Sequence, residues 1–134
     1  MHDAVRMASV IPNVRFVLVK RNFDDTVLRI FSRRYSSGNA YAYNLATIRD
    51  HVTWYHQMMD IIVAKLAAIT CVVSYEEMVA DPHSALKTVA VLCGLPMPES
   101  PLPAFGDDRG CAAPYREFME RLRKAPPPSE APAT

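Results

Sequence analysis

The chain has 134 residues, a formal net charge of +1 and 50% hydrophobic residues, which is enough for one domain with a modest core. Basic and acidic residues are interspersed, and this pattern excludes the broad basic surface that nucleic acids or anionic lipids require. The longest apolar stretch, Ile61 to Val73, contains Lys65 and Thr70 and is too short to span a bilayer. Because the N-terminus also lacks the pattern of a signal peptide, we expect a soluble, cytoplasmic protein.

A buried-type strand is predicted over residues 14–20, after a short helix from Ala4 to Val10, because the segment is rich in β-branched and aromatic residues. A helix over about 24–35 should follow. Asn22 suits its N-cap, and Asp25 three residues later can complete a weak capping box. The strand therefore passes into a helix within three residues.

Arg21 lies where this strand ends and the helix begins. Free backbone N–H groups at a helix N-terminus, together with a fixed guanidinium charge, can hold a phosphate. The alternative is that Arg21 only pairs at the surface with Asp24 or Asp25. The local pattern leaves both interpretations open.

Three further helices and one further strand complete the prediction. Asn44 can cap a long amphipathic helix over about 44–67. A second buried-type strand, 69–74, ends at Tyr75. Asp81, Pro82 and Gly94 are the start and stop signals of a helix over 82–93, and a last amphipathic helix spans about 114–124. The Pro- and Ala-rich segment 125–134 is expected to be a disordered tail after a domain of residues 1–124.

This order of elements predicts an α/β fold whose two strands are parallel neighbours joined by a right-handed crossover. In open α/β sheets, ligands bind beyond the carboxyl ends of the strands. Arg21 and Tyr75 should therefore lie on the same rim. The cysteines are odd in number and lack the spacing of metal ligands, so we expect no metal and a reducing compartment; they are Cys71, Cys93 and Cys111.

Four segments in this order resemble the carboxyl-terminal half of the sulfotransferase domain that uses 3′-phosphoadenosine-5′-phosphosulfate. They are Pro12 to Arg34, GNAYAYNL, SYEEMVADP and LCGLP. The likeness covers roughly Ala4 to Pro98 and is closest to the bacterial branch linked to tetratricopeptide repeats. It implies a partial P-loop-like sulfotransferase fold and a nucleotide donor as partner, whereas the acceptor stays unknown.

The resemblance also implies roles for three residues. In that family the arginine after the first of these strands, and a serine eight residues later, hold the 3′-phosphate of the donor, and the tyrosine ending the next strand contacts the adenine. Arg21 and Tyr75 match, whereas Arg29 stands in place of the serine. Arg29 could add charge to the site, or it could form an ion pair with Asp25 one turn earlier.

The family's phosphosulfate-binding loop and general base have no counterpart in this sequence, and a later basic loop is barely suggested by Arg109 to Tyr115. We therefore expect a fragment or degenerate copy that is inactive alone and that self-associates through an open strand edge. The alternatives are a non-catalytic interaction domain and a fragment of a nucleotide kinase, although the absence of a Walker lysine counts against the latter.

Overall fold

The computed structural model describes residues 3–33, 35–99, 102 and 106–124. The chain divides into two compact units. Unit 1 consists of residues 1–22 and 55–107, and unit 2 of residues 23–54 and 108–134. The predicted tail, 125–134, lies outside the described residues, and the predicted domain bounds stay a prediction.

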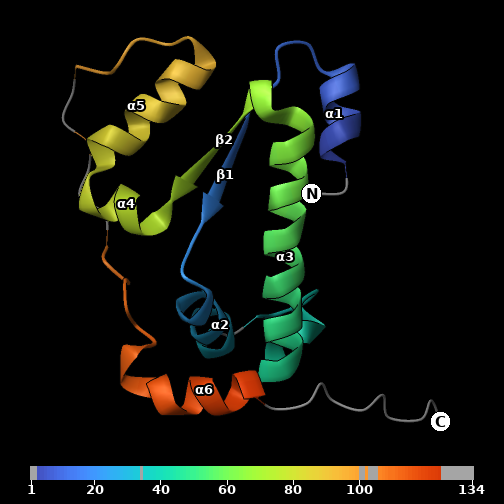
Figure 1. Cartoon of the computed structure of the whole chain (residues 1–134), viewed down its shortest axis with the longest axis vertical. Helices are drawn as coiled ribbons and strands as arrows, with labels where there is room; N and C mark the ends of the chain where they lie inside the picture. Colours follow the sequence, from blue (N-terminus) through green and yellow to red (C-terminus); the bar gives the residue numbers. More distant parts are fainter. Residues whose placement is uncertain (1–2, 34, 100–101, 103–105, 125–134) are drawn as a thin grey trace. The chain divides into compact units, whose positions relative to one another are not determined.

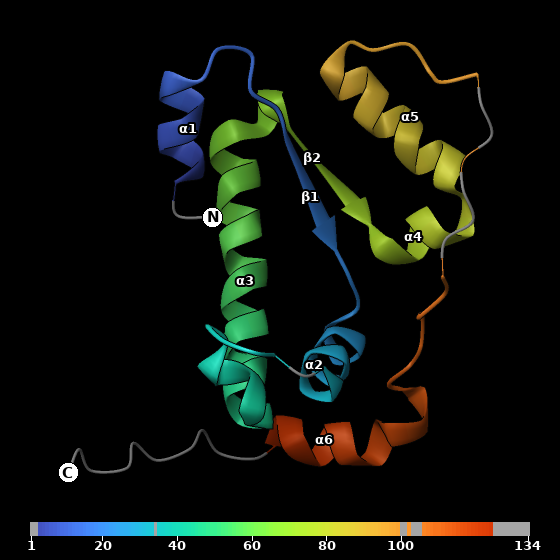
Figure 2. The ribbon, with the colours of Figure 1, turned by 180° about the vertical axis from the view of Figure 1, so that it is seen from behind.

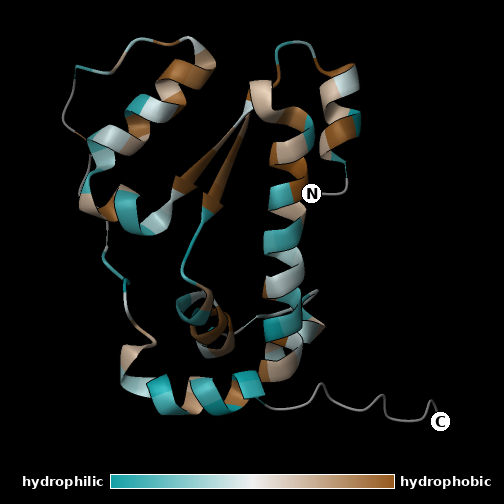
Figure 3. Cartoon of the chain, viewed as in Figure 1, coloured by the Kyte–Doolittle hydropathy of each residue, from teal (hydrophilic) through white to brown (hydrophobic). Residues whose placement is uncertain are grey.

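Unit 1 is built on a parallel sheet of two strands, β1 (Phe16–Lys20) and β2 (Thr70–Ser74). They pair in register from Phe16 opposite Thr70 to Lys20 opposite Ser74. Figures 1 and 2 show the strands side by side from opposite directions. Figure 3 shows that most of each strand is hydrophobic. The predicted α/β class and the parallel pairing are therefore confirmed.

The helices predicted over 4–10 and 82–93 are present with those bounds, and unit 1 contains a further helix that was not predicted. Helix α1 (Ala4–Val10) precedes β1. Helix α5 (Pro82–Cys93) is capped by Asp81, whose side chain accepts a hydrogen bond from the amide of Ser84, and it ends at Gly94 with a positive φ of 65°. The prediction missed α4 (Tyr75–Ala80), a six-residue helix that starts directly after β2 and is capped by Ser74.

Unit 2 has its own hydrophobic core. Helix α2 (Phe23–Ser32), the first half of α3 (Leu45–Leu66) and α6 (Arg116–Lys124) contribute to it. Four fully buried residues form its centre: Val27, Ile48, Val52 and Met119. The predicted cap of α3 is confirmed, since Asn44 Oδ1 accepts a hydrogen bond of 2.8 Å from the amide of Ala46. No helix among the described residues is both long and apolar enough to cross a membrane.

Candidate functional site

The two site residues that sequence reasoning places at the strand ends do meet in unit 1. β1 ends at Lys20, immediately before Arg21, and β2 ends at Ser74, immediately before Tyr75. Because the strands are parallel and in register, both residues leave the sheet at its carboxyl rim. The guanidinium carbon of Arg21 lies 4.5 Å from the centre of the Tyr75 ring, in a cation–π contact. The rim thus combines a fixed positive charge with an aromatic surface.

Glu76 is a member of this rim that sequence reasoning missed. Its carboxylate accepts a hydrogen bond of 2.8 Å from the backbone amide of Asn22 and one of 3.0 Å from the hydroxyl of Ser74. The first of these bonds joins the residue after Arg21 to the residue after Tyr75, and the second is local to the end of β2. Its position two residues after β2 could have identified it, because the first polar residues after a parallel strand lie at the rim where ligands bind.

The pKa of Glu76 reflects these contacts. Burial alone would raise it, but hydrogen bonds from the amides of Asn22 and Glu76 and from the hydroxyl of Ser74, together with the charge of Arg21, bring the pKa below its ordinary value of 4.5. Glu76 is therefore ionised at neutral pH. It balances the positive charge of Arg21 and ties the two strand ends together.

The lowered pKa of Glu76 predicts a pH-dependent contribution to stability. A carboxyl whose pKa is lower in the folded than in the unfolded chain stabilises the fold above the unfolded value, and this stabilisation disappears as the pH falls through the folded value. We expect the free-energy difference of unfolding between the wild type and Glu76→Gln to be constant above about pH 5 and to shrink below pH 4.5. Urea unfolding of both proteins from pH 3 to pH 7 measures it, and a difference that persists unchanged at pH 3 would contradict the assignment.

Helix α3 adds a second group of charged residues to unit 1. The Lys20 ammonium lies 3.5 Å from the Asp60 carboxylate. His56 stands one helical turn before Asp60. Burial and the charge of Lys20 lower the pKa of His56 below 6.5, against the opposing effect of Asp60. The imidazole is therefore mostly neutral at pH 7. The described residues contain no group of three or more metal-binding side chains.

Arg29 lies in unit 2 and has a different partner from the one predicted. Its guanidinium is 2.8 Å from the carboxylate of Asp108, and both side chains are 42% exposed. Of the two alternatives for Arg29, the ion pair with Asp25 is therefore wrong. The reason is that the chain returns to α2 after residue 106 and supplies a closer carboxylate, which local helix spacing cannot reveal.

Asp25 is one of two buried polar residues among those described, and its carboxylate holds the returning segment. The backbone amides of Gly110 and Ala112 donate to it at 2.7 Å and 2.8 Å. The amide of Asn22, which the predicted capping box assigned to Asp25, donates to Glu76. Two backbone amides satisfy a buried carboxylate better than a reciprocal cap exposed to solvent, so Asp25 is a tertiary anchor. Asp24 likewise has a partner far along the sequence, because it forms an ion pair with Arg123.

A comparison with protein families gives a match that covers most of these elements. A family model described as "Sulfotransferase family" matches residues 1–99. This match includes β1, Arg21, Arg29, β2, Tyr75 and the helices up to α5. No curated protein and no solved structure gives a significant match. Since the family match covers well over half of the 134 residues, this chain belongs to the sulfotransferase family.

Proposed function

We propose that this chain carries the nucleotide half of a sulfotransferase donor site, in which Arg21 binds the 3′-phosphate and Tyr75 contacts the adenine of 3′-phosphoadenosine-5′-phosphosulfate. The observation that supports this most directly is the contact between the Arg21 guanidinium and the Tyr75 ring at the carboxyl ends of two parallel strands. A guanidinium offers a phosphate paired hydrogen-bond donors, and an aromatic ring offers a purine a flat surface. Both kinds of group are needed to recognise an adenosine 3′-phosphate.

The hydrogen bonds around Arg21 fit this role. The carboxylate of Glu76 holds the backbone amide that follows Arg21 and also binds the side-chain hydroxyl of Ser74, at the end of the neighbouring strand. A cation held against a ring is restricted before the ligand arrives, so less conformational entropy is lost on binding. In this proposal Glu76 is a positioning residue, and its negative charge keeps the rim from attracting anions indiscriminately.

The complete reaction of such an enzyme would transfer the sulfuryl group of the donor to a hydroxyl or amine acceptor. That step needs a base for the acceptor proton and cations for the negative charge that develops on the leaving phosphate. The sequence contains no glycine-rich phosphate-binding spacing. We therefore assign only donor binding to this chain. Acceptor binding and catalysis are assigned to none of its residues.

Donor binding is expected to depend more on Arg21 than on Arg29. Arg21 stands at the strand end beside Tyr75, whereas Arg29 already pairs with Asp108. With 3′-phosphoadenosine-5′-phosphate as probe, we expect weak binding to the isolated chain. The phosphosulfate-binding loop of the family has no counterpart in this sequence, so the several charge-assisted hydrogen bonds that such a loop would donate, of roughly 1.5–3 kcal/mol each, are not formed. Arg21→Ala should abolish that binding.

Calorimetry and NMR titration of Arg21→Ala, Arg29→Ala and Arg29→Ser measure this difference. Arg29→Ala and Arg29→Ser should each change the affinity by less than about threefold, because a partly exposed ion pair contributes little. An equal loss in Arg21→Ala and Arg29→Ala would show instead that Arg29 is a phosphate ligand. Submicromolar binding to the wild type would show that the chain holds more of the donor site than we propose.

A non-catalytic interaction domain is the second candidate function. The exposed valines of β1, Val17 and Val19, favour it, because an exposed apolar sheet face is a surface that other chains can cover. In that case the Arg21 contact with Tyr75 would be structural. Loss of nucleotide binding in Arg21→Ala separates the two, since only the donor-site proposal predicts it.

A further inference from the structure

A pocket of about 260 Å³ lies in unit 1 between β2 and the helices α4 and α5, away from Arg21 and Tyr75. Four of its lining residues are apolar and four are polar. Eight residues line it: Val72, Val73, Glu77, Ala80, Asp81, Ser84, Ala85 and Thr88. Pockets for small-molecule ligands usually have about 300–1,000 Å³, so this one suits a single long side chain better than a nucleotide.

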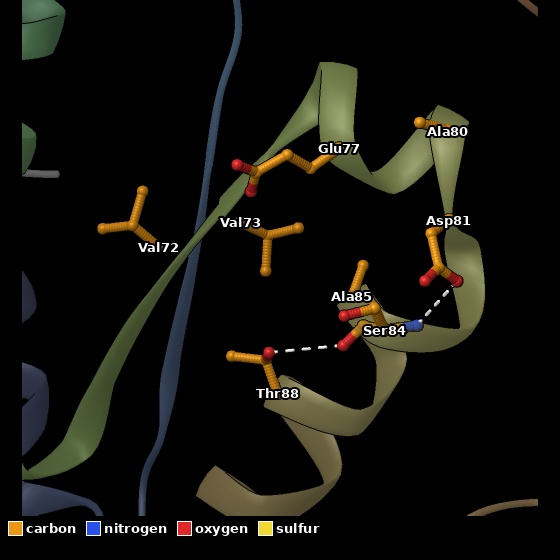
Figure 4. A pocket seen from close by; sticks show the side chains of 8 residues that line it. All are labelled: Val72, Val73, Glu77, Ala80, Asp81, Ser84, Ala85 and Thr88. Carbon is orange, nitrogen blue, oxygen red and sulfur yellow. Dashed lines mark hydrogen bonds between the residues drawn. The ribbon is translucent and has the colours of Figure 1, made fainter.

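The charge of the lining is one-sided. Glu77 and Asp81 bring two carboxylates, and no lining residue is basic. Figure 4 shows Glu77 extending from α4 toward β2, with Asp81 across the same space at the start of α5. The hydroxyls of Ser84 and Thr88 complete the polar part of the lining. A group with an apolar stem and a cationic head, which is the chemistry of Lys and Arg, complements this lining.

The pocket also borders an open strand edge. Among the described residues the sheet has two strands, so β2 is paired on its β1 side alone. Val72, in the middle of β2, is 43% exposed and lines the pocket. An unpaired edge presents backbone N–H and C=O groups to which an extended chain can add as a further strand. The edge and the pocket are thus adjacent parts of one surface.

We propose that this surface binds an extended segment of a partner protein, which adds to the outer edge of β2 and places a Lys or Arg side chain in the pocket of Glu77 and Asp81. The backbone edge supplies affinity without regard to sequence, and the two carboxylates select the basic residue. None of these residues belongs to the proposed donor site, so the surface is independent of nucleotide binding.

Three blocked hexapeptides of alternating valine and threonine test the proposal, with lysine, norleucine or glutamate at one central position. We expect the lysine peptide to bind the full chain and to shift the backbone amide signals of Cys71 to Val73 in NMR spectra. The norleucine peptide should bind about 1.5- to fivefold more weakly, which is the range of a partly exposed ion pair, and the glutamate peptide more weakly still.

Matched variants keep the fold while changing the charge. Glu77→Gln retains the size of the side chain, and Asp81→Asn retains an N-cap for α5. Both should remove the preference for lysine over norleucine, whereas Glu117→Gln on α6 should not. Thr88→Lys should place a cation in the pocket and abolish binding of the lysine peptide, and Thr88→Met serves as its uncharged control.

Two results would overturn the proposal. One is equal affinity for the lysine, norleucine and glutamate peptides, which would mean that the carboxylates select nothing. The other is the absence of any amide shift on β2 at millimolar lysine peptide, with far-UV circular dichroism showing a folded chain, which would mean that Glu77 and Asp81 only keep the edge solvated.

Discussion

Replacing Asp25 by alanine is expected to destabilise the chain by about 2–3 kcal/mol. Asp25 is 3% exposed, and its carboxylate accepts hydrogen bonds from the backbone amides of Gly110 and Ala112. Ala112 is buried, and a buried donor left without a partner costs about 1–3 kcal/mol, whereas Gly110 is exposed and its amide can bind water instead. Against a total stability of about 5–15 kcal/mol for a domain, this is a large fraction. The amides of Gly110 and Ala112 lie at the start of the segment that continues into α6, so the packing of Met119 should be lost with them.

Urea unfolding, followed by circular dichroism and by the fluorescence of the single tryptophan, Trp54, measures this effect. Asp25→Asn should be less damaging than Asp25→Ala, because the amide oxygen can still accept one of the two hydrogen bonds. Asp50→Asn, at an exposed position of α3, is the control and should change the stability by less than about 0.5 kcal/mol. A similarly small change for Asp25→Ala would show that the anchor has no structural role.

The chain is also expected to self-associate at micromolar concentration. Two parallel strands are too few for a stable sheet, and parallel strands are usually covered on both faces. In the part of the chain that the structure describes, β1 has β2 as its only strand neighbour. Val17 and Val19 on β1 are 40% and 46% exposed, on the face of the sheet that they share with residues of α5. A strand edge without a partner, beside an exposed apolar face, can pair with other chains.

Sedimentation velocity of the wild type beside two lysine variants tests this expectation. Val19→Lys places a charge on the apolar face beside the open edge of β1 and should shift the population toward monomer. Val91→Lys changes an even more exposed valine on α5 and should leave the association unchanged. A wild type that sediments as a clean monomer at tens of micromolar would contradict the idea that the β1 edge is open in solution.

Much of the fold could be predicted from the sequence because its signals are local. The strands read as apolar runs, and the caps Asn44 and Asp81 and the left-handed Gly94 mark helix ends in the predicted places. Helix α4 could not be predicted in this way. It has six residues, too few for a hydrophobic period, and it directly follows a strand without an intervening turn.

The candidate site was predictable only in part. Arg21 and Tyr75 follow from the rule that parallel strands share a carboxyl rim. The partners of Asp25 and Arg29 do not, since Gly110, Ala112 and Asp108 are about 80–90 residues away and carry no periodic signal. Local spacing could offer Asp25 only as a capping residue or as the ion-pair partner of Arg29. In the structure both residues bind the returning segment, and the amide of Asn22 donates to Glu76.

The most direct test of the donor-site proposal compares two nucleotides that differ only in the 3′-phosphate. The ¹⁵N-labelled chain is titrated with 3′-phosphoadenosine-5′-phosphate and with adenosine 5′-phosphate while the amide signals from Lys20 to Asn22 and from Ser74 to Glu76 are followed. We predict shifts at both segments with the first nucleotide, and much weaker shifts near Arg21 with the second, because Arg21 would lose its phosphate partner. Identical responses to the two nucleotides, or shifts confined to other parts of the chain, would contradict the assignment of Arg21 and Tyr75 to the donor site.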